Sequence, residues 1–403
     1  MDTLPELYSY NSPARFWRLA AEPQVSPAEW NEAIDAAASL LPEAARVLGT
    51  DGNALMYAVL GEGQFGPGHW QLGAAKRLYY ALQPVLPRAL VLAWRRLYRF
   101  NQRDEYGFGW PVEERYVRFQ FQVVQNILDR RGETCLPFIH FWPHDARYAF
   151  VLPPDVERER GQSFVRDLAA LEEEHGFRSS FNFVPEVYRL DRDLMAELRE
   201  RGFEVGVHGL KHDGKLFSSR SEFERRATRI NQALRDLGAV GYRSPLMHRN
   251  PDWMQSLDIE YDVSFFDTDP YEPMPGGTMS IWPFFLGHFV ELPYTLVQDH
   301  TLMVILREQT PRLWLEKVDY IRQFNGMALL CSHPDYLRDP NYLAIYEEFL
   351  QEMHVRKGFW HALPCEVARW WCARAETTME LQNGQWGASN LPDASVGYLE
   401  RSS

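Results

Sequence analysis

Hydrophobic residues recur at helical spacing in the first third of the chain. In 27-PAEWNEAIDAAASLLPEAARVL-48, apolar side chains are three or four positions apart among strong helix formers, and Ser26 stands where an N-cap belongs. A second apolar stretch, 76-KRLYYALQPVLPRALVLAWRRLYRF-100, is interrupted by two prolines and carries arginines clustered at its end. It is either a core helix with solvated arginines, the reading we favour, or a face that contacts a membrane peripherally or binds a partner. We expect a mainly helical region over residues 1–137.

From residue 138 onward, short apolar runs alternate with helical patterns. Several of these helical patterns end at a glycine, the residue that commonly follows the last turn of a helix. Repeated strand–helix units favour a parallel sheet or barrel with functional groups at the carboxyl ends of the strands. We therefore expect an α/β fold, with a (β/α) barrel over residues 138–355. The predicted strands are 148–152, 178–184, 203–207, 241–242, 261–266 and 327–331, and the predicted helices are 162–175, 191–201 and 221–237.

Residues 356–403 follow this region, and we expect them to form a C-terminal helix and a polar tail. The tail, 376-ETTMELQNGQWGASNLPDASVGYLERSS-403, is polar and is predicted to be partly disordered. A length of 403 residues is compatible with two or three such parts.

The composition indicates a globular protein with a large core. Hydrophobic residues make up 45% of the chain and aromatic residues 14%, which excludes a disordered protein. The formal charge is −13, from 42 basic and 55 acidic residues, and this argues against a broad nucleic-acid-binding surface. The first residues lack a signal-peptide pattern, and no apolar run of about 18 residues predicts a transmembrane helix.

Cysteine usage points to a reducing compartment. The four cysteines, Cys135, Cys331, Cys365 and Cys372, form no CxxC pair, so we expect reduced thiols in a cytoplasmic protein. Cys331 stands close to His333 in sequence, but adjacency in sequence does not make a nucleophile and its base, and we do not assign a catalytic cysteine.

Polar residues follow several predicted strands at the point where each strand ends. Because the carboxyl ends of parallel strands meet at one edge, we expect these side chains to converge. The residues at these ends are Asp155 and Glu157, His208 and His212, Arg243, Asp262, Asp267 and Asp269, and His333.

The stretch 203-FEVGVHGLKHDG-214 supplies two histidines four residues apart. If the chain turns helically after the strand, His208 and His212 share one face and can bind one ion. A catalytic zinc site uses three protein ligands with imidazole nitrogen or carboxylate oxygen atoms, and Asp155 or Glu157 can be the third. The other carboxylate is then free to act as a base. Iron, cobalt, nickel and manganese suit the same donor set.

The order of these motifs resembles that of the NodB-homology polysaccharide deacetylases, carbohydrate esterase family 4. The resemblance extends over about residues 140–350 and implies a distorted (β/α) barrel with metal-dependent deacetylase activity. The matching segments are 152-LPPDVE-157, 208-HGLKH-212, 243-RSPL-246, 261-YDVSFFDTDP-270 and 329-LLCSHP-334.

The resemblance also implies catalytic roles. Asp155 matches the base that takes a proton from water, and Arg243 matches the arginine that orients this base. His333 matches the general acid for the leaving amine. An acidic residue of the segment 261–270 is expected to keep this histidine protonated, and of Asp262, Asp267 and Asp269 we choose Asp267.

Glu157, His208 and His212 match the metal ligands of the family, with zinc the most fitting ion. Two departures stand near these ligands. Glu157 replaces the usual aspartate and is one methylene longer. Pro153 and Pro154 precede the base where the family has other residues, and proline removes backbone donors.

Further residues near the strand ends are candidates for contact with a sugar. The aromatic ones are equally compatible with core packing in a chain so rich in aromatic residues. The candidates are Pro245, Trp282, Tyr294 and Tyr336.

These observations predict a metal-dependent deacetylase that hydrolyses the N-acetyl group of a sugar in bacterial polysaccharide or glycoconjugate assembly. Its expected partner is an acetylated sugar or glycoconjugate. Two alternatives stay open. The same fold could act on another amide, or the chain could be a catalytically degenerate glycan-binding or scaffold protein, which the two prolines before Asp155 favour.

Overall fold

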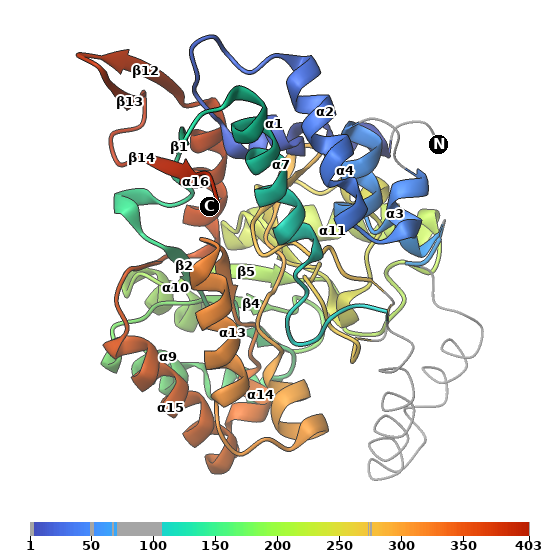
Figure 1. The fold of residues 1–403 in the computed structure, drawn as a ribbon. Helices are drawn as coiled ribbons and strands as arrows, with labels where there is room; N and C mark the ends of the chain where they lie inside the picture. The colour runs from blue at the N-terminus through green and yellow to red at the C-terminus, as the bar shows by residue number, and fades with distance from the viewer. Residues whose placement is uncertain are drawn as a thin grey trace.

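The computed structural model describes residues 4–48, 52–66, 68–70, 107–272, 274 and 276–402. Helices dominate the described chain before residue 135, and strands and helices alternate after it (Figure 1). The stretch 76–100, with its two open readings, lies outside the described residues. Within the described part of the chain, every helix is too short or too polar to span a bilayer.

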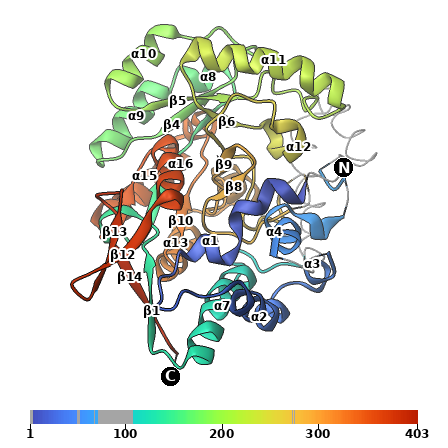
Figure 2. The same ribbon diagram turned by 90° about the horizontal axis from the view of Figure 1, so that it is seen from above.

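The helical prediction for residues 27–48 is confirmed. Ser26 caps α2 (Pro27–Ala37) in a capping box: its hydroxyl accepts the Glu29 N–H at 3.3 Å, and the Glu29 carboxylate accepts the Ser26 N–H at 2.8 Å. α7 (Arg115–Arg131) lies beside α2 (Figure 2). The other elements here are η1 (Pro5–Asn11), α1 (Pro13–Trp17), η2 (Ala38–Leu40), α3 (Glu43–Leu48), α4 (Gly52–Leu60) and η3 (Gly63–Phe65).

A buried ion pair connects this helical region to the rest of the molecule. Glu62, just after α4, is fully buried and pairs with Arg249, which follows the main sheet strand β6 (Gly241–Arg243). Glu62 also accepts the Gly277 N–H at 2.7 Å. The Arg249 guanidinium lies 4.8 and 4.9 Å from the ring centres of Phe265 and Phe266. Because each charge is stable in the interior only with its partner, the two regions depend on each other.

The main sheet has seven strands in the order β3-β4-β5-β6-β7-β9-β8. Neighbouring strands are parallel, except that β8 and β9 form an antiparallel pair. The central strands β4, β5 and β6 are buried almost throughout, as is typical of parallel strands that are covered on both faces. The remaining bounds are β3 (Asp155–Val156), β4 (Ser180–Phe183), β5 (Glu204–His208), β7 (Tyr261–Asp262), β8 (Phe284–Leu286) and β9 (Phe289–Glu291).

A second sheet has three parallel strands in the order β10-β2-β11. The chain after β10 reaches the main sheet on both sides, because the Asp155 N–H donates to the Ser332 carbonyl at 2.8 Å and Leu296 forms a parallel bridge with Leu330. The strands are β2 (Tyr148–Val151), β10 (Met327–Leu329) and β11 (Phe359–His361).

The predicted α/β architecture with a parallel sheet is present, and the parallel strands are divided between these two sheets. Pro153 and Pro154 separate β2 from β3. Neither proline has an N–H group to donate, so the ladder is interrupted at this point.

Helices cover the outer side of β4, β5 and β6 (Figure 2). α10 (Arg192–Glu200) and α11 (Arg220–Leu237) match the prediction closely, and α11 ends at Gly238, whose φ of +55° is typical of a helix C-cap. The predicted helix 162–175 is divided into α8 (Glu159–Gln162) and α9 (Val165–Glu174). The other helical elements are η5 (Pro143–Asp145), η6 (Pro245–Met247), α12 (Pro251–Met254), η7 (His300–Leu306), α13 (Arg312–Gln323), α14 (Pro334–Leu337), α15 (Pro340–Val355) and α16 (Pro364–Glu376).

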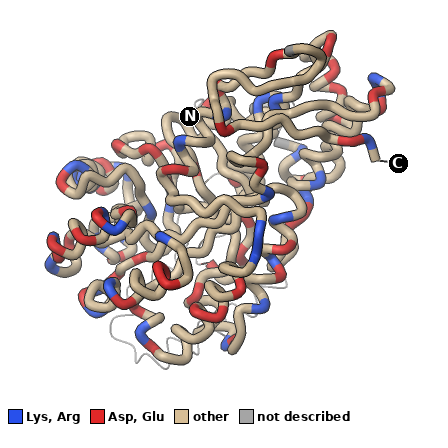
Figure 3. Tube along the Cα trace, turned by 90° about the vertical axis from the view of Figure 1, so that its left-hand side faces the viewer, with Lys and Arg blue, Asp and Glu red and all other residues tan. Residues whose placement is uncertain are grey.

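Acidic and basic residues are interspersed along the chain (Figure 3), and the outer helices carry ion pairs. Arg201 pairs with Glu197 at 2.9 Å on α10, and Arg220 pairs with Glu224 at 3.0 Å on α11. Exposed pairs of this kind contribute at most about 1 kcal/mol each. Burial of the apolar faces therefore holds these helices on the sheet.

The C-terminal tail is ordered, and the prediction of partial disorder is wrong. β12 (Thr378–Gln382) and β13 (Gln385–Ser389) form an antiparallel hairpin. β14 (Val396–Glu400) pairs with β1 (Cys135–Ile139), with Cys135 opposite Glu400. Gly397 allows close packing, since a Cβ there would lie 2.6 Å from a ring carbon of Phe138. β1 supplies the hydrogen-bond partners of β14 and so holds this part of the tail in place.

Candidate metal centre and active site

The strand register brings the predicted site residues to one edge of the sheet. His208, the last residue of β5, lies opposite Arg243 at the end of β6. Asp155 on β3 lies opposite Asn182 on β4, and Asn182 lies opposite Gly206 on β5. A Cβ on Gly206 would lie 2.0 Å from the Asn182 Oδ1. The missing side chain thus makes room for Asn182, whose Nδ2 donates to the Asp155 Oδ1 at 3.2 Å.

A glycine also shapes the turn that returns His212 toward His208. Gly209 has a φ of +62°, and a Cβ there would lie 2.5 Å from the Cγ of Pro245. Both the backbone conformation and the close approach require glycine. Pro245 is buried against this turn, so it packs against the segment that connects His208 to His212.

Glu157, His208 and His212 form one group of possible metal ligands, with donor atoms all within 4.8 Å of one another. The His212 Nε2 lies 3.0 Å from the Glu157 Oε1. The His208 Nδ1 lies 3.2 Å from the Arg243 carbonyl, which fixes the proton on Nδ1. The Nε2 of His208 is buried and has no hydrogen-bond partner among the described residues. The Nδ1 of this imidazole is thus held by a backbone carbonyl, and its Nε2 keeps a lone pair that can bind a metal ion.

The charge states of these residues also suit a cation. Burial lowers the pKa of His208 to about 4, so its imidazole is neutral at pH 7. Burial opposes ionisation of Glu157, but the neighbouring His212 outweighs it and holds the pKa of Glu157 well below its usual range. Burial lowers the pKa of His212, but Glu157 outweighs burial and raises it, so His212 has to release its proton when an ion binds. Neutral imidazole and ionised carboxylate are the forms that bind a divalent ion.

Asp155 lies beside this group and is held as a carboxylate. Burial raises its pKa, but the Arg243 guanidinium paired with it outweighs this effect, so the pKa of Asp155 is lowered. The Arg243 Nη1 donates to the Val263 carbonyl at 2.9 Å, which fixes the guanidinium in place. The Sγ of Cys331 lies 3.4 Å from the Asp155 Oδ2. Asp155 is therefore a desolvated, oriented base candidate.

His333 faces the same centre and is held by Asp299. Its Nδ1 lies 2.6 Å from the Asp299 Oδ1, and its backbone N–H donates to Oδ2 at 2.7 Å. The Nε2 lies 4.0 Å from Asp155 Oδ2 and 3.8 Å from Glu157 Oε1. Burial lowers the pKa of His333, but the Asp299 carboxylate outweighs burial and raises the pKa to about 9. This imidazolium can donate a proton at neutral pH.

The prediction that Asp267 holds His333 is wrong. Asp267 Oδ2 is paired with the buried Lys317 Nζ at 2.7 Å. The other two acidic residues of the segment 261–270 also have partners elsewhere: Asp262 accepts the Ser264 hydroxyl at 2.6 Å, and Asp269 accepts the Tyr294 hydroxyl.

Two of the predicted sugar-contacting aromatic residues belong to the core. Trp282 is 0% exposed, donates its indole N–H to the Asn325 carbonyl and packs on Phe16 at 4.9 Å. Tyr294 is 1% exposed, so its ring cannot stack on a sugar face. Tyr336 is partly exposed, and its ring centre lies 5.4 Å from that of His333. Of the three aromatic candidates, Tyr336 is the one that is not buried.

Sequence reasoning missed a residue that positions Glu157. The Asp335 Oδ2 accepts the N–H groups of Glu157 at 3.1 Å and Arg158 at 3.3 Å. Gly161 lies against the same carboxylate, since a Cβ there would be 2.3 Å from Oδ2. The only signal in the sequence is that Asp335 follows His333 closely.

No family model matches the chain, and no curated protein matches it. Solved structures do. A probable polysaccharide deacetylase from Pseudomonas aeruginosa PAO1 is 16% identical with a TM-score of 0.49, over 58% of this chain and 93% of that chain. The Puue allantoinase is 15% identical with a TM-score of 0.49, over the same shares of the two chains. A family 4 carbohydrate esterase from Streptomyces lividans is 13% identical with a TM-score of 0.35, over 53% of this chain and 91% of that chain.

Proposed function

We propose that the chain is a metal-dependent deacetylase that hydrolyses the N-acetyl group of a sugar. The observation that carries the proposal is the group Glu157, His208 and His212, in which a buried imidazole nitrogen faces the other donors without a hydrogen-bond partner. Asp155 and His333 border this group: the Asp155 Oδ2 lies 3.8 Å from the His208 Nδ1, and the His333 Nε2 lies 3.8 Å from the Glu157 Oε1. A base, an acid and a metal-ligand set in one place are what amide hydrolysis requires.

The two bordering residues have complementary roles. Asp155 is kept ionised by Arg243 and accepts the proton of the attacking water. His333 is kept protonated by Asp299 and donates a proton to the leaving nitrogen. Opposite charge states of two neighbouring groups at one pH are typical of an acid–base pair. Proton transfer by such positioned groups contributes about 10²–10⁴-fold to the rate.

Glu157, His208 and His212 are the residues that would hold the ion. A bound divalent ion supplies Lewis acidity, which lowers the pKa of coordinated water and polarises the acetyl carbonyl. Zinc suits the donor set best, and cobalt, nickel, manganese or iron also suit it.

A degenerate binding protein is the less favoured function, because Pro153 and Pro154 leave the position of the base intact. The Leu152 and Pro154 carbonyls still accept hydrogen bonds from β4, at 2.9 Å each. The Asp155 N–H still donates to Ser332. Each proline lacks only a donor, so the chain continues to the base in register with its neighbours.

The proposal includes a distorted (β/α) barrel over residues 138–355, with a helical region at 1–137 and a C-terminal part at 356–403. It also includes an acetylated sugar or glycoconjugate as the substrate and a cytoplasmic location. Hydrolysis of another amide is the second candidate, and substrate screening separates the two.

Two measurements test the proposal. Plasma mass spectrometry of the purified protein should find about one divalent ion per chain, lost in His208→Ala and His212→Ala but kept in His354→Ala, an exposed histidine whose Nδ1 contacts the His175 carbonyl. Acetate release from N-acetylated sugars should fall by about 10²–10⁴-fold in Asp155→Asn. The mechanism is wrong if the protein takes up no ion. It is also wrong if acetate release is unchanged in Asp155→Asn.

A further inference from the structure

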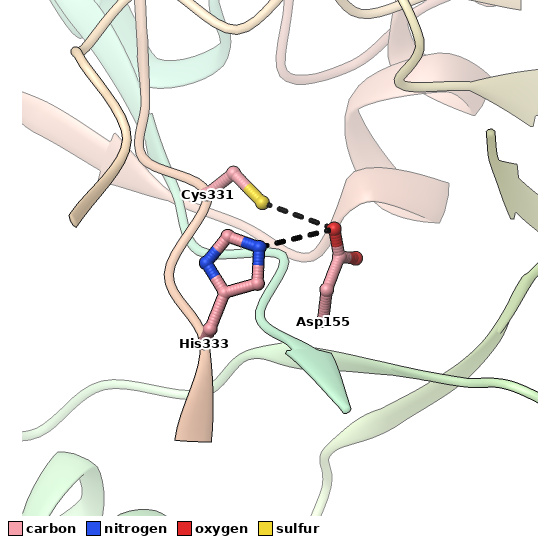
Figure 4. A group of neighbouring side chains, drawn as sticks. All are labelled: Asp155, Cys331 and His333. Atoms are coloured by element: carbon pink, nitrogen blue, oxygen red, sulfur yellow. Dashed lines mark hydrogen bonds and ion pairs between the residues drawn. The ribbon is translucent and has the colours of Figure 1, made fainter. Parts of the chain in front are cut away.

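Three side chains beside the metal centre form a second group of donor atoms. Asp155, Cys331 and His333 bring an oxygen, a sulfur and a nitrogen atom within 4.8 Å of one another (Figure 4). The Asp155 Oδ2 lies 3.4 Å from the Cys331 Sγ and 4.0 Å from the His333 Nε2. Tetrahedral zinc, with bonds of about 2.1–2.3 Å, holds neighbouring ligand atoms about 3.4–3.6 Å apart. Small side-chain movements therefore suffice to place all three atoms around one ion.

The surroundings of these atoms orient them toward each other. Because Asp299 engages the Nδ1 of His333, the Nε2 faces Asp155, and a carboxylate behind an imidazole is the usual support of a metal-binding histidine. The Cys331 thiol donates to the Asp155 Oδ2, which also accepts from Arg243. An ion that replaces the thiol proton would take up the same lone pair and leave the Arg243 pair intact.

We propose that Asp155, Cys331 and His333 bind a second, thiophilic divalent ion such as Zn²⁺ or Cd²⁺. Binding breaks the S–H bond of Cys331 and the Nε2–H bond of His333, forms metal–sulfur and metal–nitrogen bonds, and releases two protons to water. No electron is transferred. The soft thiolate selects zinc or cadmium over magnesium and calcium, which prefer oxygen ligands.

The first centre, in which Glu157 and His212 are partly exposed, adjoins this buried group. The side chains of Glu157 and His212 are 17% and 18% exposed, and the Glu157 Oε1 lies 3.8 Å from the His333 Nε2. A carboxylate between two ions is common in two-metal sites, where the ions lie about 3.5–4 Å apart. Glu157 is placed to serve both groups.

The second ion would inhibit the deacetylase. It occupies the Asp155 oxygen that accepts a proton and the His333 nitrogen that donates one. This consequence rests on the proposed function, whereas the binding of the ion does not. Excess zinc or cadmium should therefore lower acetate release after the first centre is filled.

The test uses the full chain loaded with one equivalent of zinc and titrated with Cd²⁺. The ultraviolet charge-transfer band of a cadmium–thiolate bond should saturate at about one further ion per chain. The band should fall at least tenfold in Cys331→Ser and in Cys331→Ala, two variants checked for folding by circular dichroism. Cys372→Ser, which changes an exposed thiol, should keep the full band. A band that survives in both Cys331 variants overturns the proposal.

His208→Ala separates this proposal from the proposed function. The variant should lose the ion of the first centre and keep the cadmium–thiolate band. If no acetylated sugar is hydrolysed but the band depends on Cys331, the second site stands and the function fails. A band that disappears in His208→Ala would assign Cys331 to the first centre and overturn the second site.

Discussion

Asp299 binds His333 through two hydrogen bonds, one to the backbone N–H at 2.7 Å and one to Nδ1 at 2.6 Å. The parallel bridge between Leu296 and Leu330 explains this contact. Each partner stands three positions after a bridged residue, and equal offsets along parallel strands bring residues side by side. The imidazole therefore has a fixed ring orientation and a fixed tautomer before any substrate binds.

We expect Asp299→Asn to shift the alkaline limb of the kcat profile to lower pH. The Asp299 carboxylate raises the pKa of His333 to about 9, so its removal lowers the pKa and the acid form is lost earlier as pH rises. At pH 8 we expect kcat to fall by about 10–100-fold. The measurement is acetate release from pH 6 to 10.

Asp267→Asn is the matched control for this change. Asp267 pairs with Lys317 and does not contact His333, so the variant should lose stability while the alkaline limb stays in place. An alkaline limb that moves in Asp267→Asn and not in Asp299→Asn would reverse our assignment.

Gly209→Ala should disrupt the metal-ligand turn. The φ of +62° costs an alanine about 1–2 kcal/mol, and its Cβ would clash with Pro245. The clash moves the segment that carries His212, so we expect reduced metal content as well as reduced stability. Gly384→Ala is the control, because Gly384 has a φ of +80° in open space. If both variants keep equal metal content, the close packing on Pro245 does not position the ligand.

Glu62→Ala should lower the free energy of unfolding by about 3–5 kcal/mol, because it leaves the Arg249 charge buried without its carboxylate. The variant should therefore unfold at a lower urea concentration than the parent protein. Glu62→Ala combined with Arg249→Met should recover part of this loss, because no buried charge remains. Glu32→Ala removes an exposed pair with Arg130 and should cost less than about 1 kcal/mol. Equal losses in Glu62→Ala and Glu32→Ala would show that the buried pair does not hold the two regions together.

Glu172→Gln should flatten the dependence of stability on pH. Burial raises the pKa of Glu172 from 4.5 to about 7. The folded state thus holds a proton that the unfolded state releases, and stability is lost as pH rises from 4.5 to 7, by about 3 kcal/mol. Urea unfolding at pH 5 and pH 8 should show a smaller difference in Glu172→Gln than in the parent protein. Glu174→Gln changes an exposed residue of the same helix and should leave the difference between pH 5 and pH 8 unchanged. If the difference also becomes smaller in Glu174→Gln, Glu172 is not the source of the pH dependence.

The regular elements could be predicted from the sequence because their signals are local. The N-cap Ser26 marks the start of α2, Gly238 marks the end of α11, and a short run of mainly apolar residues marks β5. The tail could not be predicted in the same way. β14 is a short strand in a polar tail, and it pairs with β1, a contact between distant parts of the chain that no local pattern reports.

The site residues also differ in whether a local sequence signal reveals them. His208, His212, Arg243 and Asp155 stand at ends of strands that the hydrophobic pattern reveals, so their convergence could be expected. Asp299 lies in a segment with no strand signal, and only the bridge at Leu296 brings it to His333. The sequence did not reveal that Trp282 and Tyr294 are buried, because an aromatic residue near a strand end can lie either in the core or on the surface.

The pairing of β14 with β1 has a consequence for biosynthesis. β1 leaves the ribosome long before residues 396–400 are made. The edge of β1 that pairs with β14 therefore has no partner strand during this time. An unpaired edge is a template for association with other chains. The nascent protein therefore carries this unpaired edge until β14 emerges, and a stop codon just before residue 396 would leave the edge of β1 without this partner.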